Sequence, residues 1–183
     1  MAKVTKRYKL PHRRRAEKKT DYRRRLALVK SGKTRLVIRR TSSHIRVQFV
    51  SYVPEGDKTL VTATSQELAK YGWTSGTGNL PAAYLTGLLA GTKAKGKVGE
   101  AVLDIGVQVS TKGSRIYAAL KGVMDAGVSV PHDPEIIPKD DRIKGGHIAN
   151  WSAKAAKPSF SKYDPKEISK NFEETKAKIM KVS

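Results

Sequence analysis

Residues 35–50 read RLVIRRTSSHIRVQFV, and this stretch determines the predicted fold class. Apolar and polar side chains alternate strictly over residues 44–50, which is typical of a strand with one buried face. Residues 35–40 form a second predicted strand, and the Thr41-Ser42-Ser43 turn joins the two as a hairpin. The turn has no Asn-Gly pair, so its geometry stays open. The apolar face of the second strand consists of Ile45, Val47 and Phe49.

The rest of the chain adds helices to this hairpin. Thr64 and Glu67 form a predicted capping box for a short helix that ends near Tyr71. Further strands are predicted at 59–64, 101–105 and 128–130, and further helices from Thr20 or Asp21 to Lys30, from Asn79 or Leu80 to Ala94, and from Ser114 to about Gly127. Leu26 and Val29, with Leu28 as a further candidate, are the expected apolar side of the helix that ends at Lys30. Strands that alternate with helices after an antiparallel start predict an α/β fold with a mixed sheet, packed as a sandwich of layers.

The chain changes character after Pro131, where prolines divide it into short pieces. Weak helical patterns over 139–155 and 165–181 predict a partly helical extension that wraps a partner or the main domain and builds no second core. The predicted organisation is a basic extended arm over residues 1–19, an α/β core over 20–132 and a C-terminal extension over 133–183.

The charge of the chain is concentrated at its start. The net charge is +21, and residues 1–40 hold 17 Lys or Arg against only two acids. Such a surplus indicates a polyanionic partner, first a nucleic acid and second an anionic membrane. A membrane arm needs an apolar face, which the first 19 residues lack. There is no cysteine, and no apolar block behind Lys3 that would indicate a signal peptide, so we expect a cytoplasmic protein.

A second cationic surface is predicted on the outward face of the hairpin. No acid occurs between Thr34 and Pro54, whereas an ordinary solvated face mixes charges of both signs. A face of this kind suits sugar–phosphate contacts over a broad area, with hydroxyl and amide groups available to RNA 2′-hydroxyls or base edges. The side chains assigned to it are Arg35, Arg39, Ser42, His44, Arg46 and Gln48.

Catalytic and cofactor motifs are incomplete. Gly32-Lys33-Thr34 lacks the earlier glycine of a P-loop, because Ala27 occupies that position. Gly76-Thr77-Gly78 continues to Pro81 where a dinucleotide fingerprint needs a third glycine. Asp104 ends an apolar strand as a metal ligand of a nuclease does, but Asp125 is the only other carboxylate candidate nearby. We therefore expect a structural Asp104, no metal and no cofactor, with a metal-dependent nuclease and a generic RNA-binding module as alternatives.

Several linked motifs resemble one known family. They are Arg7-Tyr8-Lys9, Arg13-Arg14-Arg15, Lys19-Thr20-Asp21-Tyr22, the hairpin itself, Lys70-Tyr71-Gly72, Gly78-Asn79 with residues 82–90, Leu103-Asp104-Ile105-Gly106, residues 122–127 and Val130-Pro131-His132. Together they resemble the large-subunit ribosomal protein eighteen family in its archaeal and eukaryotic form, whose eukaryotic counterpart is large-subunit ribosomal protein five. The resemblance covers roughly residues 7–132, and the intermediate length of the chain favours an archaeal source.

The resemblance implies a structural ribosomal protein without catalytic activity. Its core would be related to the ribonuclease-H-like fold. Its partners would be 5S rRNA, the large rRNA and a neighbouring 5S-binding protein in the central protuberance of the large subunit. RNA contacts would come from the N-terminal segment and the adjacent sheet face. On this chain those positions are Lys6, Arg7, Tyr8, Lys9, Arg13, Arg14, Arg15, Tyr22, Arg23, Arg24, Ser42, His44, Arg46 and Gln48.

Overall fold

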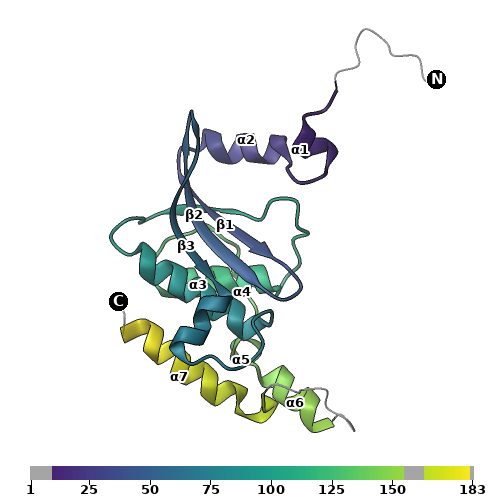
Figure 1. Cartoon of the computed structure of the whole chain (residues 1–183), viewed down its shortest axis with the longest axis vertical. Coiled ribbons are helices and arrows are strands. Elements are labelled where there is room, and N and C mark those ends of the chain that lie inside the picture. The colour runs from purple at the N-terminus through teal and green to yellow at the C-terminus, as the bar shows by residue number, and fades with distance from the viewer. Residues whose placement is uncertain (1–9, 155–162, 182–183) are drawn as a thin grey trace, which may run out of the picture.

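The computed structural model describes residues 10–154 and 163–181 (Figure 1). Within them, the sheet has four strands in the order β3-β2-β1-β4, where β1 is Thr34–Arg40, β2 is Ile45–Val53, β3 is Gly56–Thr64 and β4 is Ala101–Asp104. β1 pairs antiparallel with β2 and parallel with β4, and β2 pairs antiparallel with β3. The predicted α/β class with a mixed sheet is confirmed.

The predicted hairpin forms as its alternation requires. Leu36 and Ile38 on β1 and Val47 on β2 are completely buried on one face of the sheet. The turn, which the sequence left open, is closed by Thr41. Its backbone N–H donates to the His44 carbonyl at 2.8 Å, and its Oγ1 accepts from the His44 N–H at 2.9 Å. A side chain therefore supplies the turn geometry that glycine provides in tighter hairpins.

Two helices cover the apolar face of the sheet, α3 (Leu80–Ala94) and α4 (Arg115–Asp125) (Figure 1). They cross at glycines. A Cβ atom added at Gly87 would lie 2.0 Å from the Ala119 carbonyl oxygen, and one added at Gly122 would lie 2.1 Å from the Tyr84 carbonyl oxygen. These glycines let the two backbones touch, so the helix pair packs as one layer under the sheet.

Two short elements of the core differ from their prediction. The Thr64–Glu67 capping box forms, but the helix behind it is the 3₁₀ helix η1 (Ser65–Tyr71). Of the strand expected at 128–130, only an isolated bridge between Glu100 and Ser129 remains. Both segments are short, and short segments are fixed by their neighbours more than by their own pattern.

The C-terminal part packs on the main domain. It consists of η2 (Pro134–Ile136), α5 (Asp140–Lys144), α6 (Gly146–Lys154), η3 (Pro165–Glu167) and α7 (Ile168–Lys181). From α7, Ile168, Phe172 and Ile179 are at most 2% exposed and belong to the same hydrophobic core as the sheet. The Phe172 ring lies 5.4 Å from the Tyr84 ring on α3. This extension therefore enlarges the one core of the described residues.

The N-terminal segment lies over the opposite face of the sheet from α3 and α4 (Figure 1). It contains α1 (Arg13–Ala16), a helical turn where an extended arm was expected, and α2 (Tyr22–Lys30). Of the apolar side predicted for α2, Leu28 and Val29 are half-buried, but Leu26 is 55% exposed, and none of the residues of α2 is fully buried against the rest of the described chain. None of the helices in the described ranges has the length and apolar character needed to cross a bilayer.

Candidate nucleic-acid interface

The helix α2 carries cations on its exposed surface because of a local capping interaction. The Asp21 carboxylate accepts hydrogen bonds from the backbone N–H groups of Arg23 (3.0 Å) and Arg24 (3.3 Å), which fixes the start of the helix. The Arg23 and Arg24 side chains then face solvent. Next to them, the Tyr22 ring lies 5.2 Å from the His12 ring. The cap thus places a basic first turn beside an aromatic pair.

The basic triplet before α2 is also exposed. The Arg13 side chain is 88% exposed, and its Nε donates to Glu17 at 2.9 Å. The Arg14 Nε donates to Thr20 Oγ1 at 2.9 Å, which ties the turn after α1 to the start of α2. Exposed guanidinium groups with only such local partners remain available to phosphate oxygens. The predicted positions Lys6, Arg7, Tyr8 and Lys9 lie outside the described residues.

The outward face of the sheet differs from its prediction at Arg35. Its side chain is 3% exposed, whereas an accessible cation was expected. Its Nη1 donates to Asp104 Oδ2 at 3.1 Å, and its Nη2 forms an ion pair with Asp57 Oδ1 at 2.8 Å. The expected purely cationic face therefore holds two carboxylates, which reach it from β3 and β4. These acids lie outside the stretch between Thr34 and Pro54, so that stretch alone could not reveal them.

The outward face of the sheet carries two further arginines, Arg39 and Arg46, whose environments differ. They are opposite each other in the antiparallel register of β1 and β2, where two like charges repel. Arg39 is hydrogen-bonded to Asp104. Its Nη2 donates to the Asp104 carboxylate at 2.9 Å, and its Nη1 donates to the Asp104 backbone carbonyl at 2.6 Å. Arg46 is exposed. Of the two, Arg46 is the more accessible to an anionic partner, while the Arg39 side chain, paired with Asp104, is 39% exposed.

The turn of the hairpin is held by residues that the sequence did not single out. His44 Nδ1 lies 3.2 Å from Thr77 Oγ1, and its Nε2 lies 3.3 Å from the Gln66 amide nitrogen. Arg115, from the start of α4, donates to the Gly78 carbonyl at 2.6 Å. Burial lowers the pKa of Arg115, and the nearby Arg40 lowers it further. The exposed Ser42 and half-buried His44 therefore lie on a braced turn, and no sequence motif indicated Arg115.

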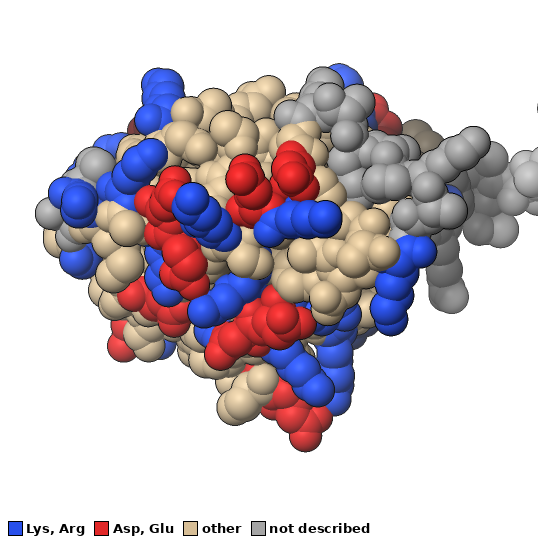
Figure 2. Space-filling view, turned by 90° about the horizontal axis from the view of Figure 1, so that it is seen from below, with Lys and Arg blue, Asp and Glu red and all other residues tan. Residues whose placement is uncertain are grey.

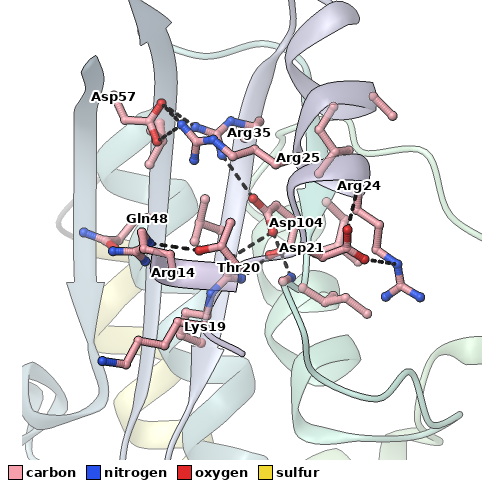
Figure 3. Close-up of a pocket in the computed structure, with 18 of the residues that line it drawn as sticks. Arg14, Lys19, Thr20, Asp21, Arg24, Arg25, Arg35, Gln48, Asp57 and Asp104 are labelled. Atoms are coloured by element: carbon pink, nitrogen blue, oxygen red, sulfur yellow. Dashed lines mark hydrogen bonds and ion pairs between the residues drawn. The ribbon is translucent and has the colours of Figure 1, made fainter. Parts of the chain in front are cut away.

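A cavity of about 640 Å³ lies between the N-terminal segment and the sheet (Figure 3). Its floor includes Val37, Gln48 and Val50, and Leu28 of α2 contributes to the opposite wall. The cationic side chains around it are Arg14, Lys19, Arg24, Arg25, Arg35 and Arg39, and the acidic ones are Asp21, Asp57 and Asp104. Cations outnumber acids here, so the cavity is a positively charged recess beside the exposed arginines.

Asp104 is held by hydrogen bonds and ion pairs within the sheet. Its Oδ1 accepts from the Gly106 N–H at 2.8 Å, and both carboxylate oxygens are engaged by guanidinium groups. Asp125 accepts from the Tyr84 hydroxyl at 2.7 Å, on helices that cover the other face of the sheet. Among the described residues no group of three His, Cys, Asp or Glu side chains could hold a metal ion. Two arginines from β1 thus neutralise the charge of Asp104.

The opposite end of the molecule has a different charge character. Seen from below, Lys and Arg alternate with Asp and Glu (Figure 2). Lys144 of α5 pairs with Glu173 of α7 at 2.9 Å, and Lys121 of α4 pairs with Asp140. Glu173 raises the pKa of Lys144, and Lys121 lowers the pKa of Asp140. Such mixed charge neutralises itself, so the cationic surplus of the fold lies on the side of α1 and α2.

The sequence matches the family described as ribosomal large subunit proteins 60S L5 and 50S L18, over residues 6–101 and 93–133. The chain belongs to this family. A large ribosomal subunit protein uL18 from Korarchaeum cryptofilum is 54% identical, over 97% of this chain and 96% of its own length. Proteins of the same name from Haloarcula marismortui and Halobacterium salinarum are 46% and 47% identical, each over 95% of this chain and over 94% and 96% of their own lengths.

These matches extend the resemblance seen in the sequence. The family model ends at residue 133, where the motifs also end. The archaeal relatives align over nearly the whole chain, so the segment that forms α5, α6 and α7 belongs to the archaeal proteins as well. The expected archaeal type of the family is confirmed. The family consists of ribosomal proteins, and the resemblance noted from the sequence is correct.

Proposed function

We propose that this chain is a structural constituent of the large ribosomal subunit that binds 5S rRNA and helps to attach it to the large rRNA in the central protuberance. The observation that carries the proposal is the joint placement of exposed arginines on α1, α2 and the sheet, in a chain of this family. The neighbouring partner would be another 5S-binding ribosomal protein, and the site of action the cytoplasm. The two-layer α/β core would be a non-catalytic relative of the ribonuclease-H-like fold.

The proposed mechanism is phosphate neutralisation by a preformed cationic surface. Arg13 and Arg24 have side chains that are 88% and 67% exposed, and such groups can pair with phosphates without first leaving a buried partner. Arg46 and Gln48 extend the contact onto the sheet, where an amide can also reach base edges or 2′-hydroxyls. The remaining proposed contacts are Lys6, Arg7, Tyr8, Lys9, Arg14, Arg15, Tyr22, Arg23, Arg39, Ser42 and His44.

The buried position of Arg35 changes its proposed role. A guanidinium with two carboxylate partners and 3% exposure would have to abandon both partners to reach a phosphate. Removing a partner from a buried ion pair costs about 3–5 kcal/mol. We therefore assign Arg35 to the support of the binding face, and residues 1–19, 20–132 and 133–183 to the roles of arm, platform and supporting extension.

Titration of RNA binding against salt tests the proposal. Log affinity for 5S rRNA should fall with log salt by about 0.7–0.9 per neutralised phosphate, and deletion of residues 1–19 should reduce this slope strongly. Bulk tRNA as competitor separates a 5S-specific protein from a generic RNA-binding module. A slope unchanged by the deletion, or equal affinity for tRNA, would contradict the proposal.

A further inference from the structure

The helix α2 rests over the sheet with little apolar packing to hold it. None of its residues is buried among the described parts of the chain, and Leu26 is 55% exposed. The cavity of about 640 Å³ lies under it, with Ala27 and Leu28 on the wall. Burial of apolar side chains is what usually fixes a surface helix to its domain. Leu28 and Val29 are only half-buried, so polar contacts also contribute to the position of α2.

One ion pair connects α2 with the sheet. Arg25 Nη2 lies 2.8 Å from both carboxylate oxygens of Asp57, which comes from the start of β3. Among the ion pairs of the described residues, this is the only one between α2 and a strand. Figure 3 shows the guanidinium groups of Arg25 and Arg35 side by side at the Asp57 carboxylate, with a further ion pair from Arg35 to Asp104.

Asp57 also pairs with a buried residue of the sheet. Its second partner, Arg35, is 3% exposed and also pairs with Asp104 of β4. Leu36 and Ile38, next to Arg35 on the same strand, are completely buried in the core. Desolvation raises the pKa of Asp57, but the hydrogen bonds and charges of Arg35 and Arg25 outweigh it and lower the pKa overall. Asp57 is thus an ionised bridge between a loosely packed helix and a rigid strand.

We propose that Asp57 is a positioning residue for RNA binding, which holds α2 at a fixed place over the sheet through Arg25. With α2 held, its exposed arginines and Arg46 of the sheet form one preorganised surface. A preorganised surface binds more tightly because its side chains and helix are already ordered, so binding costs less conformational entropy. This inference rests on the proposed function, since it explains how the same surface keeps its shape.

The direction of the change in RNA affinity on substitution of Asp57 distinguishes a positioning role from simple charge repulsion. An acid beside a phosphate-binding surface repels RNA, so its neutralisation alone should tighten binding, by about twofold for one charge within a Debye length. Loss of the bridge should instead weaken binding, by about fivefold, or about 1 kcal/mol at 1.4 kcal/mol per tenfold. Positioning and repulsion therefore predict opposite changes for the same substitution.

The experiment compares Asp57→Asn with Glu100→Gln in the full-length chain, using 5S rRNA as the probe. Glu100 pairs with Lys33 at 2.7 Å, outside α2, so its substitution changes the net charge equally and leaves the bridge intact. We expect Asp57→Asn to weaken binding about fivefold and Glu100→Gln to leave it equal or slightly tighter. Asp57→Glu, which keeps the carboxylate, should restore most of the affinity.

Hydrogen exchange and a double variant test whether the change in binding arises from the position of α2. Amide hydrogen exchange over residues 22–30 of the free protein should accelerate in Asp57→Asn, and also in Arg25→Gln, which alters a surface side chain that the core does not need. In the Arg25→Gln background the bridge is already absent, so Asp57→Asn should then tighten binding. Unchanged exchange, or tighter binding by Asp57→Asn alone, would overturn the inference while leaving 5S rRNA binding intact. A wild-type chain without preference for 5S rRNA would overturn the proposed function and this inference together.

Discussion

Replacing Gly87 by Ala should destabilise the fold, although alanine favours helices more than glycine does. The added Cβ would lie 2.0 Å from the Ala119 carbonyl oxygen and 2.7 Å from its carbonyl carbon, both of them backbone atoms of α4. Intrinsic helix propensity favours Ala by about 0.8–1.0 kcal/mol. Overpacking costs about 1–3 kcal/mol where side chains can adjust, and more where a backbone must move. Because the nearest atoms are backbone, we take an overpacking cost of about 3–4 kcal/mol, which leaves a net loss of about 2–3 kcal/mol after the gain in helix propensity.

Urea unfolding followed by circular dichroism measures this loss of free energy, and thermal unfolding measures the matching change in Tm. For a chain of this length, each kcal/mol lowers Tm by about 2–4 °C, so we expect a decrease of about 5–10 °C. Gly99→Ala is the control, because no heavy atom of the described residues lies within 4 Å of a Cβ at that position. Its free energy of unfolding should stay within about 0.5 kcal/mol of the wild type. Equal stability of Gly87→Ala and Gly99→Ala would refute the close crossing of α3 and α4.

Three further predictions follow from the site and the core. Arg46→Ala should weaken 5S rRNA binding with an unchanged Tm. Arg35→Ala should lower the free energy of unfolding by about 1–3 kcal/mol, because the buried Asp104 Oδ2 loses its guanidinium partner while Arg39 still pairs with Oδ1; equal stability of the two variants would contradict their assignment. Phe172→Ala should cost about 3–5 kcal/mol in chemical unfolding, since this side chain is 2% exposed; a loss below about 1 kcal/mol would mean that α7 does not share the core. The pKa values of Asp57 and Glu67 are lowered from 3.8 and 4.5, so their stabilisation is complete above about pH 4.5 and is lost as the pH falls through the lowered values. Unfolding curves should therefore be similar at pH 5 and 7 and shift to lower denaturant below about pH 4, and a stability that rises on acidification would contradict this sign.

The hairpin and the first helix of the layer could be predicted from the sequence because local patterns determine them. Strict alternation over residues 45–49 identifies the buried face of β2, and Asn79 identifies the start of α3, where its side chain accepts from the Ala82 N–H at 2.8 Å. In these cases the deciding residues are near one another in the sequence or on one strand pair.

The environment of Arg35 could not be predicted, because its partners are distant in the chain. Asp104 lies 69 residues away and Asp57 lies on another strand, so only the assembled sheet brings them to Arg35. The same reason hid the exposure of Leu26, since an apolar stripe shows which side of a helix can be buried and not whether another element covers it. On α7, the buried Ile168, Phe172 and Ile179 were masked by the charged residues between them.

Mapping of protein–RNA crosslinks in purified ribosomes of the source cell tests the central claim most directly. The account predicts crosslinks between 5S rRNA and peptides that contain α2 or the β1–β2 hairpin, with few from the mixed-charge side of α5 and α7. Crosslinks to 5S rRNA confined to α5 and α7, or a chain crosslinked only to other RNAs, would contradict it.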